Sequence, residues 1–475
     1  MRTVILPNMR ILLLIVGLSC TLTGFGQLNE LTEDQFIRLL LNNHPQILRA
    51  DLFQEVGRQE VRANLGFFDP IIGADFYRKN FSNSIYYNKL DAGIMQPLSF
   101  LGMDLIGGVE VNNGNFLNPA DNTPANGLVY AGVNLPLLQG MMIDRRRTDL
   151  AVSRIFRDQT NVEFIEAANN LLSNGLRSYW NWVKTLKRLE LIVGVLENNR
   201  EVFEGVKSAF LVGDRPAIDT VESFQQLQTI TLQYEQELVR LQVARNDLER
   251  FLFDNEAQPV PLESPDTDIP FESAAAFRPA ILQLLTDEDW MQHHPTIQLL
   301  ELEAKRLGVQ TRWEREQLKP RLDVNYNFLF NTNMTPLEQT FLSDNFQVGV
   351  GFSFPILMRR ALGRTEQFKI FQTQNQLMLT EEMTLLRNMY EANMYAYENL
   401  QEQVLITERI VETARALYEA ELRRFGLGES SVFLVNTREL QYLQVQNNLI
   451  ELKTEQILQS YQVAFDVGLL YKIAD

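Results

Sequence analysis

The sequence has few residues that could support redox or thiol chemistry. Its 475 residues include a single cysteine, Cys20. This cysteine lies in an apolar segment at the N-terminus, so a mature chain that has lost the segment contains neither a thiol nor a disulfide. Lipidation of Cys20 is the alternative, but Gly17 occupies a position where the lipidation motif requires a larger aliphatic residue. We therefore expect no thiol chemistry in the mature protein.

Long hydrophobic runs are also absent. After the N-terminal segment, no stretch reaches the roughly 18 uninterrupted apolar residues that are typical of a membrane-spanning helix. The N-terminal segment has the pattern of a secretory signal, because Arg2 and Arg10 precede the apolar run 11–18 and a small-residue site ends at Gly26. We expect removal of residues 1–26. Any insertion of the mature chain into a membrane would have to use strands.

Basic charge and catalytic motifs are scarce. The net charge is −17, and a chain of this charge would repel the phosphates of a nucleic acid. No Walker loop, G-x-S-x-G elbow or H-E-x-x-H run occurs. The three histidines, His44, His293 and His294, stand beside prolines at the expected starts of helices, where they can cap backbone groups. The sequence thus predicts neither an enzyme nor a metal or cofactor site, and no nucleic-acid partner.

Prolines and glycines recur with matching spacing in the two halves of the chain. The matched landmarks are two prolines 25 residues apart, a proline that ends a strand-like run, and a glycine more than 70 residues later. They are Pro45, Pro70, Pro136 and Gly213 in the first half, and Pro295, Pro320, Pro355 and Gly428 in the second. A tandem duplication explains this spacing more simply than chance does.

The duplication divides the chain into four segments. They are a signal peptide at 1–26, a first repeat at 27–253, a connector at 254–287 and a second repeat at 288–475. The connector contains five prolines, which interrupt helices, and its composition is typical of a surface linker. Each repeat is expected to contain a helix, barrel strands and a long helical hairpin.

Alternation of apolar and polar residues predicts strands in both halves. The apolar positions that we expect to face lipid are Val324, Tyr326, Phe328, Val348, Val350 and Phe352, with Ala131 in a similar run of the first half. A transmembrane barrel requires this pattern over about 9–11 residues, because lipid contacts one face and a polar lumen the other. Strands of a soluble sandwich have the same alternation, so the pattern alone leaves both folds open.

The first half has about 31 residues more than the second between its matched prolines. They include alternating runs at 91–96 and 105–112, which predict an additional strand pair within 89–112. A segment rich in Asn, Gly and Pro follows at 113–126 and predicts an exposed loop. The sequence leaves open whether the additional pair enlarges a barrel or lies outside it.

Apolar residues at alternating steps of four and three predict long coiled-coil helices in both halves. In the first half this seam contains Leu172, Leu176, Tyr179, Val183, Leu186 and Val193. A helix over 142–208 would have 67 residues and a length of about 100 Å at 1.5 Å per residue. Its antiparallel partner is expected to begin near Pro216, after a turn at Gly213. In the second half the corresponding turn is expected at 426–431, with Ser430 or Ser431 as the N-cap.

In this order of elements the chain resembles the TolC family of outer-membrane channel proteins, over nearly all of its mature length. The resemblance rests on the secretory signal, the duplication, the strands between long helices and two turn segments, 210–219 and 425–432, that precede Gln-rich helices. It implies a fold that is mainly α with β. A trimeric outer-membrane β-barrel would be continued into the periplasm by a coiled-coil barrel of α-helices.

The resemblance also implies a function and partners. The chain would be the passive exit duct of a tripartite efflux pump or a type I export system. Its partners would be further copies of itself, a periplasmic adaptor, an inner-membrane transporter and the lipid of the outer membrane. The transported substrate cannot be read from the sequence, because such a duct passes whatever the pump delivers.

By the same resemblance, the two glycine turns lie at the periplasmic tip, where an adaptor docks. The tip residues are Gly213, Asp214, Gly426, Gly428, Glu429 and Ser430. Asp219 matches an acidic position near the closed entrance of family members, but Ser430 replaces its arginine partner, and Leu434 occupies a second acidic position. The candidates to replace the missing groups are Arg215, Glu222, Arg438 and Glu439.

One function of a different class remains open. Long helical hairpins are also compatible with a periplasmic coiled-coil scaffold that has no channel and whose strands form a soluble domain. Extraction from the outer membrane that depends on detergent distinguishes a channel from such a scaffold.

Overall fold

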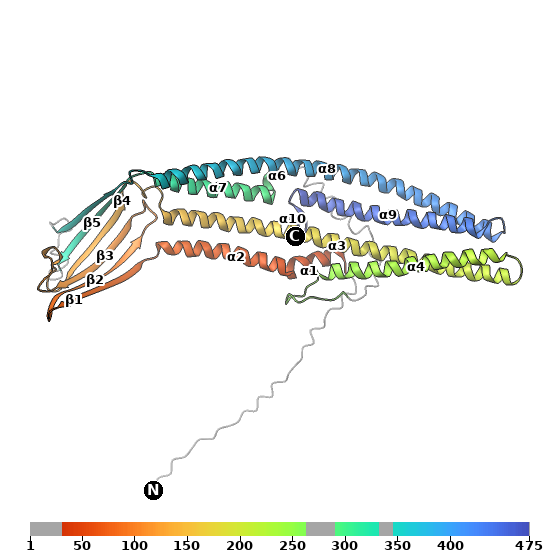
Figure 1. Ribbon diagram of the computed structural model, residues 1–475, viewed down its shortest axis with the longest axis horizontal. Helices are drawn as coiled ribbons and strands as arrows, with labels where there is room; N and C mark the ends of the chain where they lie inside the picture. The colour runs from red at the N-terminus through yellow and green to blue at the C-terminus, as the bar shows by residue number, and fades with distance from the viewer. Residues whose placement is uncertain (1–30, 263–289, 332–344, 475) are drawn as a thin grey trace, which may run out of the picture.

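The computed structural model describes residues 31–262, 290–331 and 345–474. The molecule is elongated, with a sheet of strands at one end and a bundle of long helices that extends away from it (Figure 1). The expected signal peptide, Cys20 and most of the expected connector lie outside the described residues.

Each half of the chain places its strands between helices. The first half contains α1 (Glu33–Asn43), α2 (Pro45–Leu65), η1 (Gly66–Phe68), β1 (Ile71–Phe81), β2 (Ser84–Pro97), β3 (Asp104–Asn113), η2 (Pro119–Asp121), β4 (Leu128–Pro136), α3 (Arg145–Leu211) and α4 (Ala217–Glu249). The second half contains α6 (Trp290–His293), α7 (Pro295–Glu316), β5 (Arg321–Asn331), β6 (Phe346–Ser353), α8 (Arg359–Gly426), α9 (Val432–Asp466) and α10 (Leu470–Ala474).

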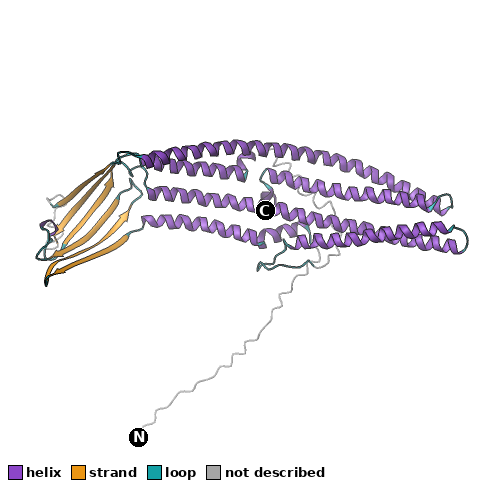
Figure 2. Ribbon diagram, viewed as in Figure 1, coloured by secondary structure: helices purple, strands orange, loops and turns teal. Residues whose placement is uncertain are grey.

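Two helices of unusual length determine the shape of the bundle. α3 has 67 residues and α8 has 68, so each extends for about 100 Å. Two shorter helices pack along each of them, α2 and α4 along α3, and α7 and α9 along α8 (Figure 2). α3 also contacts α7 and α9, and these contacts join the two halves.

In each half, the helix that leads into the strands begins with the same cap. His44 precedes Pro45 at the start of α2, and His294 precedes Pro295 at the start of α7. In each case the imidazole Nδ1 accepts a hydrogen bond of 3.2 Å from the backbone N–H two residues later. Both caps have nearly the same backbone angles, with φ of −67° and ψ of 131° and 130°. Capping is therefore the structural role of these two histidines, as the sequence predicts.

All six strands belong to one antiparallel sheet in the order β1-β2-β3-β4-β5-β6. The additional pair that the sequence predicts is β2 and β3, and it lies inside this sheet rather than beside it. β4 pairs with β5, so the sheet continues from the first half of the chain into the second. β1 and β6 are its two edges.

The main apolar core lies where α1, α3, α4, α9 and α10 meet. Tyr179, Trp180 and Trp182 of α3 are buried there. Glu33 of α1 is buried among them, and its Oε1 accepts hydrogen bonds from Trp180 Nε1 at 2.6 Å and from the Tyr461 hydroxyl at 2.5 Å. Burial raises the pKa of Glu33. One carboxyl thus links the first helix to α3 and to α9.

Two local predictions need correction, and one choice between two cap residues is decided. α3 begins at Arg145 rather than at residue 142, because the Asp144 side chain caps its N-terminus by accepting from the Arg147 N–H at 2.8 Å. Val193 is 37% exposed instead of occupying the buried seam, which runs through Ile192 and Leu196. Ser431, not Ser430, caps α9.

The buried histidine caps predict a dependence of stability on pH. Burial lowers the pKa of His294 to about 4, whereas in the unfolded chain it is about 6.5. The neutral imidazole therefore contributes fully to the free energy of unfolding above pH 6.5. This contribution, about 3 kcal/mol at most, is lost as the pH falls toward 4. Asn at this position keeps a cap acceptor but does not titrate. We expect the melting temperature of His294→Asn in detergent to fall less between pH 7.5 and pH 4 than that of the wild type.

The exposed neighbour provides the matched control. His293 is exposed, so His293→Asn should retain the pH dependence of the wild type. Equal pH dependence of all three proteins would contradict the role assigned to His294.

Candidate functional site

The strand register places most of the apolar side chains of the six strands on one face of the sheet. Val324 lies opposite Val350, Tyr326 lies opposite Val348, and Ala131 lies opposite Phe328. Side chains of directly paired residues point to the same side of a sheet. The face consists of Ile72, Ala74, Phe76, Leu90, Ala92, Ile94, Leu105, Val109, Val111, Val129, Ala131, Val133, Leu135, Leu322, Val324, Tyr326, Phe328, Phe330, Phe346, Val348, Val350 and Phe352.

This apolar face is open to the surroundings. Val350 and Phe352 are each 68% exposed, and Ile72 at the other edge is 81% exposed. Soluble monomeric proteins rarely expose contiguous apolar patches of more than a few hundred Å². The seven positions that the sequence predicts to face lipid all lie on this face, which fits contact with lipid chains.

The opposite face of the sheet is polar and rich in glycine. It carries Asp75, Lys89, Asp91, Glu110, Asn112, Tyr130, Asn134, Asp323, Asn325, Asn327 and Gln347, together with six glycines. The Tyr130 side chain lies over two of these glycines, since a Cβ on Gly93 or Gly108 would approach its hydroxyl to 3.0 or 2.7 Å. Its hydroxyl also contacts Asp91 Oδ1 at 3.1 Å. A polar face of this composition suits the wall of an aqueous passage.

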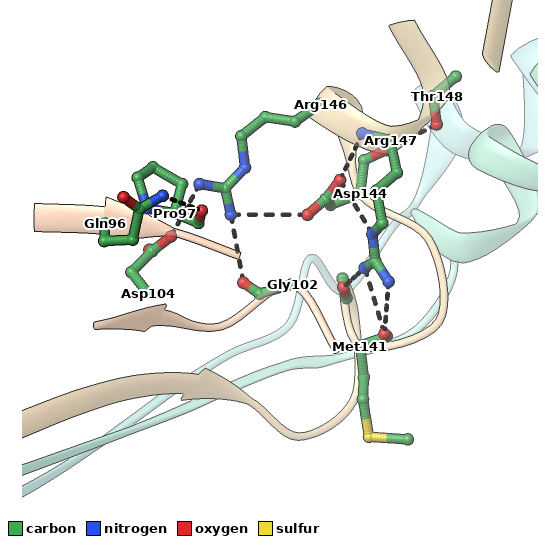
Figure 3. A network of polar contacts seen from close by, with 10 residues as sticks. Gln96, Pro97, Gly102, Asp104, Met141, Asp144, Arg146, Arg147 and Thr148 are labelled. Atoms are coloured by element: carbon green, nitrogen blue, oxygen red, sulfur yellow. Dashed lines mark hydrogen bonds and ion pairs between the residues drawn. The ribbon is translucent and has the colours of Figure 1, made fainter. Parts of the chain in front are cut away.

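A network of charged groups joins the sheet to the helices (Figure 3). Arg146 of α3 donates to Asp104 Oδ1 at 2.7 Å and to the Gly102 carbonyl at 3.2 Å, in the turn between β2 and β3. Asp144, which caps α3, lies 3.6 Å from the same guanidinium group. Arg147 donates to the carbonyls of Gly140 and Met141. The start of α3 is thereby tied both to the β2–β3 turn and to the segment after β4.

At the far end of the bundle, the two helical hairpins turn through the same backbone motif. Gly213 and Gly428 have φ of +86° and +78°, which glycine adopts without strain. The next N–H in each turn bonds back to a carbonyl five residues earlier, from Asp214 to Ala209 and from Glu429 to Arg424, both at 2.9 Å. These are Schellman motifs. Gly426, in contrast, is the last residue of α8 and has helical backbone.

The tip exposes apolar side chains beside each of these glycines. Val212 and Leu427 immediately precede Gly213 and Gly428, and their side chains are 74% and 75% exposed. Leu211, Ile218 and Phe433 are at least 60% exposed in the same region. Asp214 and Glu429 are exposed beside them. The tip thus combines rigid turns with an apolar surface.

Arg215 joins the tip of one hairpin to the tip of the other. It lies 3.4 Å from Asp219 in its own hairpin. It also donates to the Phe425 carbonyl at 3.1 Å, and its guanidinium lies 4.1 Å from the centre of the Phe425 ring. Cation–π contacts of this kind contribute about 0.5–2 kcal/mol. Of the entrance candidates, Asp219 and Arg215 are therefore brought together, and the contact to Phe425 was not predicted from the sequence.

Glu439 joins all four helices of the two hairpins. It lies on α9 and is 4% exposed. Its Oε2 accepts from Asn199 of α3 at 2.8 Å and from Gln226 of α4 at 3.3 Å, and its Oε1 accepts from Tyr418 of α8 at 3.1 Å. Burial raises the pKa of Glu439. This carboxyl is thus a buried junction within one chain, and it does not line an open surface.

The remaining candidates do not form one cluster. Ser430, which replaces the family arginine, donates to the buried carboxylate of Glu421, and Arg424 lies 3.4 Å from that carboxylate. Arg438 donates to Gln441 on its own helix, and Glu222 is half-buried. Glu421 was missed because its partner Ser430 is nine residues away and across a turn. Side-chain contacts over such a turn have no periodic signal in the sequence.

Within the described residues, no group of three or more histidine, cysteine, aspartate or glutamate side chains is arranged to hold a metal ion. In the same part of the chain, no helix combines the length and apolar composition needed to cross a membrane.

The fold matches solved structures of outer-membrane proteins, although no protein-family model matches the chain and no curated protein matches it in sequence. The CmeC outer membrane channel of Campylobacter jejuni superposes with a TM-score of 0.64 and 13% identity, covering 92% of this chain and 86% of that one. The open state of the MtrE outer membrane channel of Neisseria gonorrhoeae superposes with a TM-score of 0.64 and 12% identity. The match covers 92% of this chain and 88% of that one. The outer membrane protein VceC of Vibrio cholerae superposes with a TM-score of 0.62 and 12% identity. The match covers 92% of this chain and 95% of that one. The TolC-like fold that the sequence predicts is confirmed.

The two glycines of the second tip allow a matched test of the turn. An added Cβ has open space at both Gly426 and Gly428, but only Gly428 has positive φ. Gly428→Ala should destabilise the turn by about 1–2 kcal/mol, whereas Gly426→Ala should stabilise the end of α8 by about 0.5–1 kcal/mol. Hydrogen exchange of residues 425–433 should be faster in the first variant and slower in the second. The same change in both would contradict the turn geometry.

Proposed function

We propose that this protein is the passive exit duct of an efflux or export system in the outer membrane, and that its helices extend into the periplasm. The observation that carries this proposal is the sheet with one continuous, exposed apolar face and one polar, glycine-rich face. Such a sheet fits a barrel wall between lipid and an aqueous lumen. The matched channels of Campylobacter and Neisseria support the assignment through their shared fold.

The assembly is proposed to be a homotrimer. A single open sheet would leave the backbone groups of β1 and β6 unpaired in lipid, which is too costly without a neighbour. The number three comes from the resemblance to the TolC family. The scaffold hypothesis offers no partner for the apolar face, so the duct is favoured over it.

The tip is proposed to dock a periplasmic adaptor that links the duct to an inner-membrane transporter. Exposed Val212 and Leu427, each held beside a rigid glycine turn, supply two apolar contacts in related geometry. A photo-crosslinker at position 427 should capture an adaptor in cells, whereas one at Leu405, which is 51% exposed within α8, should not. Equal capture at both positions would remove the docking assignment.

Opening of the entrance is proposed to separate the two hairpins of one chain near the tip. The contacts that oppose this separation are those of Arg215 with Phe425 and those of Glu439 with Asn199 and Gln226. The Arg215 contacts are nearer the turns, so they would be the first to break. The contacts of the buried Glu439 would remain in place, and the hairpins would pivot about them.

Insertion of the sheet in lipid predicts a difference between adjacent residues. Val350 lies on the apolar face, and Gly351 lies on the polar face with open space around an added Cβ. Val350→Arg should cost about 2–4 kcal/mol if the residue lies near the middle of the membrane, whereas Gly351→Arg should be mild. The amount of heat-stable trimer in outer-membrane extracts measures the effect. Equal amounts of trimer for the two variants would refute the facing assignment.

The proposed link at the tip predicts an effect on conductance. Arg215→Ala removes the contact between the hairpins, so single-channel conductance in planar bilayers should rise several-fold. Asp219→Ala should raise conductance less, because Arg215 keeps its contacts with Phe425. Arg240→Ala is the control, since Arg240 pairs with Glu237 on its own helix. Unchanged conductance of Arg215→Ala would remove the link from the mechanism.

A further inference from the structure

The first half of the chain contributes two more strands to the sheet than the second half does. β1 follows Pro70 as β5 follows Pro320, and β4 ends at Pro136 as β6 ends shortly before Pro355. β2 and β3 therefore lie between the strands that have counterparts. Without them, each copy would contribute four strands to a barrel.

The additional strands are paired along their whole length. β2 pairs with β1 from Ser84 to Met95, and with β3 from Asn88 to Pro97. β3 pairs with β4 from Asp104 to Glu110. Most of their apolar residues continue the exposed face, and their charged residues Lys89, Asp91 and Glu110 continue the opposite one. A strand pair packed outside the wall would not keep this division between the two faces.

Side chains also tie the additional pair to its surroundings, both within the sheet and at the end of the sheet next to the helices. Tyr130 of β4 lies over Gly108 of β3 and Gly93 of β2, and its hydroxyl reaches Asp91 of β2. At the helical end, Arg146 of α3 holds the β2–β3 turn through Asp104 and Gly102 (Figure 3). Gly102 has φ of +67°, and an added Cβ would lie 2.7 Å from the Gly140 carbonyl oxygen. These contacts place the pair within the wall.

We propose that three copies of this chain close an 18-stranded barrel, in which β6 of each copy pairs with β1 of the next. This inference rests on the proposed function and deepens it. Six antiparallel strands leave β1 and β6 running in opposite directions, so edge pairing between copies remains antiparallel around the ring. The exposed apolar residues of the two edges, such as Ile72 and Phe352, then join into one band.

The additional strands set the width of the outlet. With strands about 4.8 Å apart and tilted by about 40°, 18 strands enclose a backbone diameter of about 36 Å, against about 24 Å for 12 strands. Side chains of a sheet layer occupy about 10 Å of that width in total, since packed sheets lie about 10 Å apart. The remaining opening is about twice the 10–12 Å diameter of an α-helix. A barrel of this width is wide enough for cargo the size of a helical polypeptide segment.

Counting strands in the assembled protein tests the proposal. Electron cryomicroscopy of the full mature chain in lipid nanodiscs should show a trimer whose barrel has 18 strands. A trimer with 12 strands in the wall, and with β2 and β3 outside it, would overturn the inference but leave the duct function intact. A chain that does not enter the nanodisc would overturn both.

Disulfide crosslinking in intact cells provides a second measurement, because Cys20 is the only native cysteine and lies in the expected signal peptide. The pair Ile72→Cys and Phe352→Cys should link copies to one another across the β6–β1 edge. The pair Ile72→Cys and Leu135→Cys should not crosslink, because β2 and β3 separate β1 from β4. A disulfide within one copy for this second pair would mean that β1 and β4 are neighbours, and it would overturn the 18-stranded wall.

Discussion

Unpaired backbone groups along the two edges of the sheet are the constraint on which the rest of this structure depends. β1 and β6 can satisfy their outward N–H and C=O groups with water or with another strand, but not with lipid. The apolar face disfavours water, and Val350 and Phe352 near one edge are both 68% exposed. In the proposed duct, copies of the chain complete the sheet at these edges. Its even number of strands allows that completion without a parallel pair.

The proposed duct function sets a different requirement for the helical part, which would have to be long and still able to change its arrangement near the tip. Apolar packing dominates around Tyr179, Trp180 and Tyr461, where α3 and α9 share a core with α1. Toward the tip the contacts between hairpins become polar, through Glu439 and Arg215. Polar contacts depend on geometry more than apolar ones do, so they can be exchanged for water when the hairpins separate. Rigidity near the core and adjustable contacts near the tip suit a gated passage.

The two halves of the chain are related but have diverged where their neighbours differ. His44 and His294 retain the same cap with the same 3.2 Å hydrogen bond. The tips retain the same glycine turns, yet only the first hairpin has an arginine that reaches across to the other. The strand pair β2 and β3 has no counterpart among the described residues of the second half, and its turn is held by Arg146 and Asp104. Insertion of two strands preserves the antiparallel order of a sheet, whereas insertion of one would not.

The sequence by itself determined the elements with regular periods. Strands are visible in it because their side chains alternate at every second residue, and the long helices because apolar residues recur every 3.5 positions. It also located the tip turns, since positive φ favours glycine at 213 and 428. It did not reveal that Glu439 is buried between the two hairpins, and it left the position of the additional strand pair open. Only the tertiary structure decided these points, because the partners of Glu439 lie on three other helices, and the place of β2 and β3 depends on their backbone hydrogen bonds to β1 and β4, which the alternation of side chains does not reveal.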